Sequence, residues 1–504
     1  MPPGPTPLPF IGNKFIIPRS KPWITFQQWS HKYGPIFTIW IGRRPTVVIS
    51  DPVIASELME KRSIKYSSRP RFVAMGELYN NMSSILVQPY GKGWSIRRKL
   101  LHQALNPSAL RLYKPIQTAE ASRLCYQLLQ SPVDYEMLID RYTSGIVFAV
   151  SYGHRIDSMD AKVIRRRLAY MQYMASLNVP GAYLVESLPV LKYLPNFLAP
   201  WKKELQEKGL KEAQDNISLY NSVKNDISSA EARGEEAPES LAKMIIKIDQ
   251  KESVGLSERD LASVPSSLFG AGSDTTASTT CSAILALVTH PEALRAAQAE
   301  LDSVVGPNRT PTFDDEPRLV YLKAFIKETL RWRPVAVLGG TPHLSTEDDV
   351  YDGFLIPRGT TILGNSWAIN LNEKYYPNPD NFDPKRFLDE TEKIYVSEKA
   401  DLERGVPHPS REGHSSFGWG RRICPGAGIA LNNLFIALAK LMWAFDIKPI
   451  PGQKYDTLDY TEGFNSRPNH FECIITSRSE HHRRIIEQEY EAAMEVIKQF
   501  PPFD

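Results

Sequence analysis

The chain has 504 residues, of which 42% are hydrophobic and 23% are charged. This ordinary globular composition excludes a disordered chain, and the length allows either two domains or one large, mostly helical domain. The 60 lysines and arginines against 57 acidic residues give a net charge of +3, which is too small to indicate a nucleic acid as a partner. The cysteines lie far apart without a CxxC pair, so we expect neither a disulfide framework nor a zinc site, and a reducing compartment fits. They are Cys125, Cys281, Cys424 and Cys473.

The N-terminus is rich in proline: residues 1–5 read MPPGP, and Pro7 and Pro9 follow. We interpret residues 1–20 as a hinge or arm. No run along the chain reaches the 18 apolar residues that a membrane-spanning helix needs.

The first regular elements after this arm are predicted as a β-hairpin and a short helix. Residues 36–41 and 46–50 are β-rich runs on either side of a turn, which is typical of a hairpin. Asp51 followed by Pro52 is a helix-start signal, with Asp as the cap and Pro in the first turn. It predicts a helix through about Lys61.

A second helix is predicted to open at residues 93–99, and it places Trp94 and Arg98 on one face. Two interpretations stay open for this pair. It is a core tryptophan beside a solvated basic run, or it binds a carboxylate through the indole N–H and the guanidinium fork. From about residue 109 to residue 250 the chain is helical in character. A polar, acidic stretch at 228–239 predicts a solvent loop.

Residues 186–201 break the helical pattern with an apolar stretch that contains three prolines. We predict that this stretch is a lip at a substrate entrance and that it dips into a membrane. A buried linker between two helices is the alternative.

A long helix is predicted from about Glu258 to Thr289, and Pro265 is expected to kink it or to mark its true start. Within it, residues 269–276 read FGAGSDTT. Two glycines and two consecutive threonines are poor helix formers, so this run in mid-helix needs an explanation. A kinked core helix with Ser and Thr hydroxyls bonded back to the backbone is one.

Glu328 and Arg331 fall on a further predicted helix, where their spacing of three places the carboxylate beside the guanidinium. A bare E-x-x-R pattern usually means a solvated surface pair. Residues 334–342 are apolar and turn-rich, and His343 follows them. Residues 350–361 are predicted as strands and turns, and residues 478–499 as a helical tail.

Cys424 lies between a glycine-rich turn and a proline, just before a helix predicted from about residue 428 to residue 445. The N-terminus of a helix lowers the pKa of a thiol through its dipole and its unpaired N–H groups. The glycines allow close backbone approach, and Arg422 adds a cation. This segment predicts an anionic sulfur that holds something large, flat and acidic.

The pattern F-x-x-G-x-R-x-C-x-G, formed by Phe417, Gly420, Arg422, Cys424 and Gly426, resembles the haem-binding loop of the cytochrome P-450 superfamily. In that family the cysteine is the proximal thiolate ligand of the haem iron, and thiolate ligation favours O–O cleavage. The resemblance implies that Cys424 is the metal ligand and that the other fixed positions bind haem b.

Further motifs of the same family occur in chain order. They are the hinge, W-x-x-x-R (Trp94, Arg98), A-G-x-D-T-T (Ala271–Thr276), E-x-x-R (Glu328, Arg331) and P-x-R-F (Pro384–Phe387). Together with the cysteine loop they cover nearly the whole chain. Two positions depart mildly from the family pattern: Lys385 replaces a glutamate, and His343 replaces the commoner arginine.

The resemblance assigns a role to each of these motifs. Trp94, Arg98 and His343 are expected to bind the haem propionates, and a loop histidine without a ligand is the alternative for His343. A local widening of the long helix is expected to place Asp274 and Thr275 where they supply the protons that cleavage of dioxygen requires. Glu328, Arg331 and Arg386 are expected to form a buried ion network behind the haem loop, with a structural role.

The implied fold is the cytochrome P-450 fold, which is mainly α with small β-sheets. It is a triangular helical prism in which haem lies between the long central helix and the helix of the cysteine loop. Residues 21–504 form a single catalytic domain, with a small β-rich part at about 30–75 and 335–400.

Microsomal members carry the hinge after an N-terminal anchor helix. We therefore expect that the anchor has been removed and that the protein works on the cytosolic face of the endoplasmic reticulum membrane. A natively soluble protein with a proline-rich arm is the alternative.

The implied function is a monooxygenase that oxidises a hydrophobic small molecule. No G-x-G-x-x-G fingerprint is present, so electrons are expected from NADPH through a separate NADPH–cytochrome P-450 reductase, with cytochrome b5 as a second donor. Arg97, Lys99 and Arg421 are candidates for docking that reductase, or are plain solvated charges. We expect a monomer that binds the membrane surface and no nucleic acid.

Two further activities stay open. One is oxidative coupling or cyclisation of an aromatic substrate by the same haem. The other is an oxygen-independent haem-thiolate isomerase or dehydratase, although family members of that type typically lose the acid–alcohol pair that this chain keeps at Asp274 and Thr275.

The substrate pocket is predicted to be mostly apolar, which favours a hydrophobic substrate held by few polar contacts. Residues 342–349 resemble filamentous-fungal or basidiomycete members of the family, which points to a secondary metabolite. The candidate lining residues are Met82, Leu86, Phe269, Ala271, Val337, Leu338 and Phe464.

Overall fold

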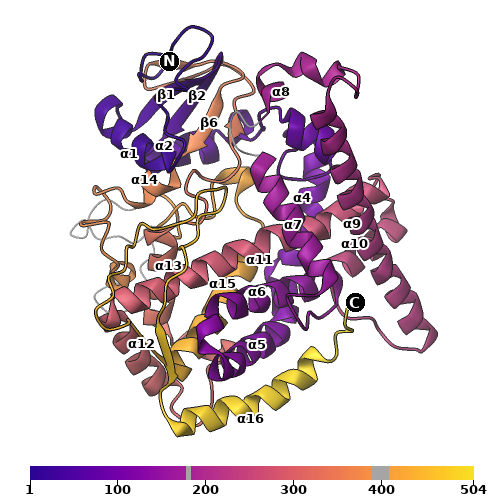
Figure 1. Ribbon diagram of the computed structural model, residues 1–504, viewed down its shortest axis with the longest axis vertical. Helices are drawn as coiled ribbons and strands as arrows, with labels where there is room; N and C mark the ends of the chain where they lie inside the picture. Colours follow the sequence, from indigo (N-terminus) through magenta and orange to yellow (C-terminus); the bar gives the residue numbers. More distant parts are fainter. Residues whose placement is uncertain (178–182, 389–407, 504) are drawn as a thin grey trace.

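A single long helix, α11 (Glu258–Thr289), crosses the middle of the molecule, and the other long helices pack around it (Figure 1). The computed structural model describes residues 1–177, 183–388 and 408–503. In these residues the fold is mainly helical with three small sheets, as expected. Residues 389–400 of the predicted β-rich part lie outside the described residues.

The predicted N-terminal hairpin is confirmed. Strand β1 (Ile36–Ile41) pairs antiparallel with β2 (Arg44–Ile49). The sheet has the order β1-β2-β6-β3, in which β2 pairs in parallel with β6 (Thr361–Gly364), and β3 (His343–Leu344) completes it. A chain segment from residue 36 and one from residue 364 therefore share one small sheet.

The helix start predicted at Asp51 is also confirmed. The Asp51 carboxylate accepts the backbone N–H groups of Val53 at 2.8 Å and Ile54 at 3.2 Å, and Pro52 is the first residue of α2 (Pro52–Ala55). The chain continues as a wider, π-helical turn over Ser56–Lys61.

The proline-rich arm lies along the outer edge of β1. The Thr38 N–H donates to the Pro3 carbonyl at 2.8 Å, and Asn13 bonds the backbone of Trp40 in both directions, each at 2.7 Å. Gly4 is needed here, since a Cβ would lie 1.9 Å from the Thr38 oxygen. The arm covers a sheet edge that would otherwise present unpaired backbone groups.

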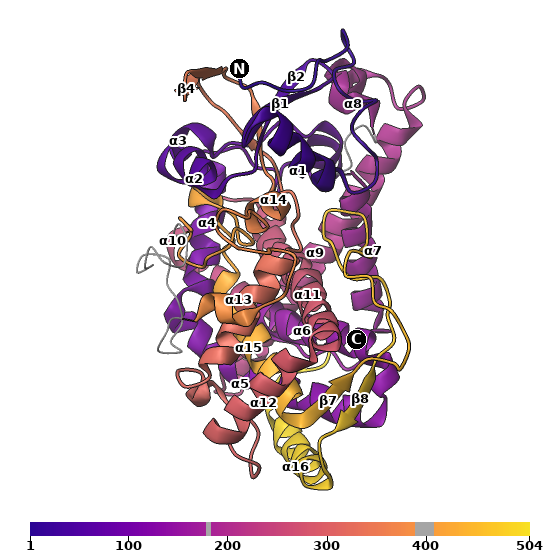
Figure 2. The ribbon, with the colours of Figure 1, turned by 90° about the vertical axis from the view of Figure 1, so that its left-hand side faces the viewer.

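The remaining structure is helical, with two strand pairs at its margins. The main helices are α1 (Pro22–Tyr33), α4 (Lys92–Leu105), α5 (Pro107–Gln130), α6 (Tyr135–Tyr152), α7 (Lys162–Leu177), α9 (Pro200–Ala232), α10 (Leu241–Glu252), α12 (Pro291–Val304), α13 (Val320–Trp332), α15 (Ala427–Ala444) and α16 (Glu480–Ile497). Short helices are α3 (Ser63–Tyr66), α8 (Leu184–Ser187) and α14 (Ser366–Asn370), and the strand pairs are β4 (Asp349–Tyr351) with β5 (Phe354–Ile356) and β7 (Phe445–Lys448) with β8 (Ile474–Ser477). Figure 2 shows β7 and β8 beside α16, at the end of the molecule opposite the β1–β2 hairpin.

Two sequence expectations about helices are wrong. The predicted loop at 228–239 begins only at Arg233, because α9 continues through Ala232, where alanine and glutamate favour the helix and Ala230 is buried. Helix α11 shows no local widening at residues 269–276, and Pro265 lies inside it rather than at its start.

The helix after the cysteine loop is a core element. Its predicted extent is confirmed to within a residue, and it packs with α5, α6 and α11 in the largest hydrophobic cluster. By length and composition α15 is the one helix among the described residues that could span a membrane, but 72% of it is buried inside the fold.

Candidate functional site

The cysteine loop is closed by its own backbone. The Cys424 N–H donates to the Phe417 carbonyl at 2.8 Å, and Gly426 caps the N-terminus of α15. Cys424 is exposed, whereas Cys125 and Cys281 are buried in the core. The loop therefore presents one thiol at a helix N-terminus, as the sequence predicts.

Gly420 fixes the loop against the N-terminal part of the chain. Its φ is +55°, in the left-handed region, and a Cβ there would lie 2.2 Å from the Met59 carbonyl oxygen. The glycine serves close packing on the π-helical turn at 56–61, rather than approach to a ligand.

The expected lowering of the thiol pKa is not observed for the free side chain. The chain packed closely around Cys424 raises the pKa of its thiol, although the side chain borders open space, and the Gly426 N–H and the Arg98 guanidinium only oppose this rise. The helix N-terminus is too weak to overcome the loss of hydration. A bound metal cation would supply the charge that deprotonates the thiol.

Four basic side chains form a connected cluster that reaches Cys424 through Arg98, and they have no carboxylate partner among the residues that the structure describes. They come from four separate segments: Arg69, Arg98, His343 and Arg422. Burial lowers the pKa of each, to about 10 for Arg422 and to about 3 for His343, and neighbouring cations of the group lower three of the four further. Such a group of unpaired cations is costly to enclose, so it indicates an anionic ligand.

The individual contacts orient this cluster. Arg422 donates to the Ser67 and Gln88 carbonyls, each at 2.7 Å, and its guanidinium lies 4.4 Å from the centre of the Trp94 ring. Arg98 acts electrostatically on Cys424 and has no hydrogen-bond partner in the described part of the chain.

Arg69 belongs to the cluster but was missed by the sequence analysis. Its Nη1 donates to the Thr341 and Pro342 carbonyls at 2.6 and 2.9 Å, while its buried Nε has no partner among the described residues. His343 bonds through Nδ1 to the Tyr66 carbonyl at 2.8 Å, so its neutral form leaves Nε2 as an acceptor. His343 must take up a proton before Nε2 can donate to an anion.

The acid–alcohol pair lies on α11. The Thr275 hydroxyl donates back to the Ala271 carbonyl at 2.6 Å, as in the back-bonded core helix that the sequence analysis considered. The Asp274 carboxylate accepts a hydrogen bond from Asn465 at 2.6 Å. Both side chains line the same cavity.

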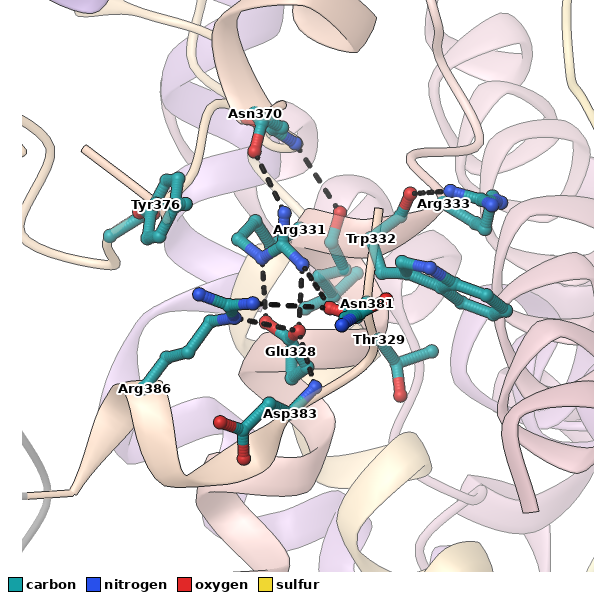
Figure 3. Close-up of polar contacts among 12 residues, drawn as sticks. Glu328, Thr329, Arg331, Trp332, Arg333, Asn370, Tyr376, Asn381, Asp383 and Arg386 are labelled. Carbon is teal, nitrogen blue, oxygen red and sulfur yellow. Dashed lines mark hydrogen bonds and ion pairs between the residues drawn. The ribbon is translucent and has the colours of Figure 1, made fainter. Parts of the chain in front are cut away.

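Glu328 lies between two arginines in the buried ion network of Figure 3. Both of its oxygens accept hydrogen bonds from Arg331, at 2.6 and 2.7 Å, and Arg386 lies 3.5 Å from Oε1. Glu328 and Arg331 are fully buried. The structure therefore brings together the three residues that the motifs pair.

This network also holds the segment that precedes the cysteine loop. Arg331 donates to the Asn370 carbonyl at 3.0 Å, and Asn370 Oδ1 accepts both the N–H and the hydroxyl of Ser415 at 2.8 Å. Ser415 lies two residues before Phe417. The ion network is thus linked to the loop by a short chain of hydrogen bonds, of which Figure 3 shows the step from Arg331 to Asn370.

The cavity that borders Asp274 and Thr275, here called the main cavity for that reason, has a volume of about 590 Å³ and lies along α11. Of the predicted lining residues, Leu86, Ala271 and Phe464 line it. The other four predicted residues do not line this cavity. Phe269 is fully buried against Phe148, and Val337 is buried in a cluster with Trp23 and Trp367. Leu338 packs on that cluster, and Met82 packs beside Gly76. Apolar character alone does not distinguish a cavity wall from a core position.

A family model described as cytochrome P450 matches residues 2–475 of this chain. The chain belongs to the cytochrome P450 family. Similar proteins include cytochrome P450 monooxygenase 58 of Postia placenta, at 36% identity over 95% of this chain and 89% of the relative. A cytochrome P450 monooxygenase of Armillaria gallica is 34% identical over 97% and 92%. Cytochrome P450 monooxygenase verL of Clonostachys rogersoniana is 34% identical over 98% and 90%. The protein is therefore a cytochrome P450 monooxygenase.

The residues of this cytochrome P450 fit haem, which the family implies. Cys424 would be the thiolate ligand, and Arg69, Arg98, Arg422 and a protonated His343 would bind the two propionates. When bound, a thiolate-ligated haem supplies the activation of dioxygen. The unpaired cations are the main evidence that the site fits haem, because the described residues provide no carboxylate to balance them and the haem propionates would.

Arg97, one of the residues predicted to dock an electron donor to this cytochrome P450, does not lie on the surface. Arg97 is buried and forms an ion pair with Asp260 at 2.6 Å, so it is not available to a partner. Lys99 and Arg421 are exposed, and Arg421 also contacts the Ser63 hydroxyl.

Proposed function

We propose that this protein is a haem-thiolate monooxygenase that oxidises a hydrophobic small molecule with electrons from a separate NADPH-dependent reductase. One oxygen atom enters the substrate and the other leaves as water, with two electrons and two protons consumed. The observation that carries the proposal is the group of four unpaired basic side chains beside the exposed Cys424 thiol.

The protons would pass through the acid–alcohol pair of α11. Asn465 holds one oxygen of the Asp274 carboxylate, and the Thr275 hydroxyl lies one residue further along the same cavity wall. Because the Thr275 hydroxyl now donates to Ala271, it must rotate away from that carbonyl to donate a proton elsewhere. Retention of this pair favours oxygen chemistry over an oxygen-independent isomerase or dehydratase. Coupling of an aromatic substrate would use the same groups.

The apolar character of the cavity supports a hydrophobic substrate, and we propose a secondary metabolite. Four methionines line the wall: Met75, Met159, Met171 and Met174. Flexible thioether side chains fill irregular space and adapt to ligands of different shape. This lining suits a skeleton of rings or branched chains.

We also propose that the protein works at a membrane surface, on the cytosolic face of the endoplasmic reticulum. Large apolar side chains are exposed around α8 and in the N-terminal arm, with Phe197 83% and Phe10 79% exposed. Both views place the arm and α8 at the same end of the molecule (Figures 1 and 2). Such a surface fits insertion into the headgroup region. The stretch at 186–201 is thus proposed as the lip rather than as a buried linker.

For electron transfer we propose that Lys99 and Arg421 contact an acidic face of the reductase, with cytochrome b5 as a second donor. Both residues are exposed, and Arg421 lies on the loop that carries Cys424. Surface charges of this kind increase association rates and lose their effect at high salt.

The first experiment is the carbon monoxide difference spectrum of the dithionite-reduced protein, for the wild type, Cys424→Ala and Cys473→Ala. A far red-shifted Soret band in the wild type and in Cys473→Ala, absent from Cys424→Ala, is expected. Cys473 is the matched control because it is a partly exposed cysteine outside the cluster. A haem-loaded wild type without this band would overturn the thiolate assignment.

A further inference from the structure

Arg167 is a buried cation in the wall of the main cavity. It lies on α7 with 3% of its surface exposed, and it reaches between α9 and α11. One terminal nitrogen donates to the Asn216 side-chain oxygen and the other to the Ser266 hydroxyl. Both partners also line the cavity.

These neutral partners leave the charge of Arg167 uncompensated. No carboxylate lies within 4.0 Å of Arg167 in the described part of the chain, and its buried Nε has no hydrogen-bond partner there. Other buried arginines are compensated: Arg141 pairs with Glu120 at 2.6 Å and Arg331 with Glu328 at 2.6 Å. Because enclosing an unpaired charge is costly, a buried arginine of this kind indicates a missing anion.

Arg333 is also buried without a carboxylate, but it differs in two respects. First, all three of its guanidinium nitrogens donate hydrogen bonds, to the Thr457 and Trp332 carbonyls, each at 2.8 Å, and to the Thr457 hydroxyl, whereas Arg167 Nε donates none. Second, Arg333 does not line the main cavity. A ring contact does not distinguish the two arginines, because Arg333 lies over Trp332 and Trp367 and Arg167 lies 5.7 Å from the centre of the Phe269 ring. Arg167 is therefore the buried arginine with free donor capacity that faces this space.

The acidic side chains of the same cavity are engaged elsewhere. Asp140 pairs with Arg467 at 2.7 Å, Asp274 accepts a hydrogen bond from Asn465, and Glu462 accepts one from the Ser20 hydroxyl. Glu212 acts electrostatically on Arg259 and forms no ion pair with Arg167. An anion that balances the positive charge of Arg167 must therefore come from a ligand.

The cavity has two chemically different ends joined by α11. Ser266 lies at the end that holds Arg167 and Asn216, and Thr275 lies nine residues further along the helix at the other end. At 1.5 Å per residue this separation is about 13 Å. Between the ends, the wall carries Met171 and the glycine Gly270. The space thus suits a molecule with an anionic head and an apolar body.

We propose that the substrate is a carboxylic acid with an apolar skeleton, whose carboxylate is bound by Arg167, Asn216 and Ser266. Asn216 accepts from Arg167 through its oxygen, so its amide nitrogen is free to donate to the same carboxylate. The oxidised carbon lies toward the other end of the cavity, beside Asp274 and Thr275. This last point rests on the proposed monooxygenase function, whereas the binding of the carboxylate does not.

The test compares three carboxylic acids with their methyl esters: dodecanoic acid, retinoic acid and dehydroabietic acid. Each is titrated into the ferric haem-loaded protein at pH 7.5, and the spin-state shift of the Soret band gives the dissociation constant. The thermal shift that each ligand produces is a second readout that needs neither turnover nor an intact spin-state signal. At least one acid is expected to bind roughly tenfold tighter than its ester, which is the effect of one charge-assisted hydrogen bond.

Three variants separate a ligand-binding role from a structural one. Arg167→Gln is expected to abolish the preference for the acid. Asn216→Asp places a carboxylate on Arg167, so it is expected to abolish the preference without loss of thermal stability. The matched control is Arg166→Gln, which removes the same charge from a 44% exposed neighbour paired with Asp215, and it is expected to keep the preference.

The proposal is overturned if no acid binds tighter than its ester in the wild type, or if Arg167→Gln and Asn216→Asp both keep the preference. These outcomes with a normal carbon monoxide spectrum would leave the haem-thiolate function standing. The reverse result, an acid-specific thermal shift without the red-shifted Soret band, would support the carboxylate site while the proposed function failed.

Discussion

Asn465 donates a hydrogen bond of 2.6 Å to the Asp274 carboxylate across 191 positions of the chain. Asn465 lies in the segment that connects β7 to β8, and Arg467 in the same segment pairs with Asp140 of α6. The Oδ1 atom of Asp274 keeps its lone pairs free of any partner in the described ranges. Asn465 thus orients the acid of the acid–alcohol pair without blocking it.

We expect Asn465→Ala to decrease the product formed per NADPH oxidised by on the order of tenfold, because a carboxylate that has lost its orienting donor is misplaced for proton transfer. The measurement is product and NADPH in a reconstituted system, with any ligand that gives a spin-state shift. Asn469→Ala is the control, since Asn469 makes a similar bond to the exposed Asp459. Equal coupling in both variants would show that Asn465 has no positioning role.

Glu328→Gln is expected to destabilise the protein by roughly 3–5 kcal/mol, because it leaves Arg331 and Arg386 without their counter-charge. Chemical unfolding followed by tryptophan fluorescence measures this, with haem content as a second readout. Glu204→Gln removes a carboxylate from an exposed pair with Lys208, and it should change the free energy of unfolding by less than about 1 kcal/mol. A Glu328→Gln variant as stable as this control would contradict the network's structural role.

Arg69→Gln is expected to speed the loss of haem severalfold, because one of the few cations available to the propionates is removed. The rate of haem transfer to an excess of a haem-scavenging protein measures this directly. Arg71→Gln is the matched control two positions away, where the arginine is exposed and paired with Glu77. If both variants release haem at the wild-type rate, Arg69 does not contact the cofactor.

Gly420→Ala should prevent stable haem incorporation, whereas Gly418→Ala should only weaken it. Both glycines have positive φ, at +55° and +76°, so both substitutions strain the backbone by about 1–2 kcal/mol. Only at Gly420 does the new Cβ also overlap a backbone atom, the Met59 carbonyl oxygen at 2.2 Å. Haem content per protein separates the two effects, and equal content would show that the loop adjusts to the overlap.

The stability of the protein should fall below pH 6.5 because of two buried histidines before the cysteine loop. Burial lowers the pKa of His408 to about 4 and that of His414 well below its ordinary value of 6.5. In each, Nδ1 accepts a backbone N–H. The unfolded chain therefore binds protons between pH 6.5 and about 4 that the folded chain does not.

Each of these histidines is expected to remove roughly 2 kcal/mol of unfolding free energy between pH 7 and pH 5. Chemical unfolding at the two pH values measures the loss. His408→Gln should reduce this loss, while His31→Gln, at an exposed position, should leave it unchanged. An unchanged pH dependence in His408→Gln would contradict the assignment.

Much of the site was predictable because short motifs bring their residues together by local geometry. Glu328 and Arg331 lie one turn apart on α13, and Cys424 lies at a turn followed by a helix, so sequence spacing alone places them. The hairpin and the Asp51 cap were predictable for the same reason. Each depends on residues a few positions apart.

The remaining site residues depend on tertiary packing, which spacing does not show. Arg69, Asn465 and Arg167 reach the site from segments that carry no motif. Arg97 and Lys99 are both basic residues of one helix, and the sequence does not distinguish them. In the structure Arg97 is buried in an ion pair with Asp260, whereas Lys99 is exposed. Phe269 was assigned to the pocket because it is apolar, but it is fully buried against Phe148 and does not line the cavity.

The parallel pairing of β2 with β6 sets the order in which the protein can fold during synthesis. Thr46 through Ile49 have no partner on that side until Thr361 through Gly364 have left the ribosome. At 5–20 residues per second this delay is roughly 15–60 s. During that time the free edge of β2 is open to pairing with other chains. Nascent chains that stop before residue 361 are therefore expected to depend on chaperones, and fragments of that length to aggregate.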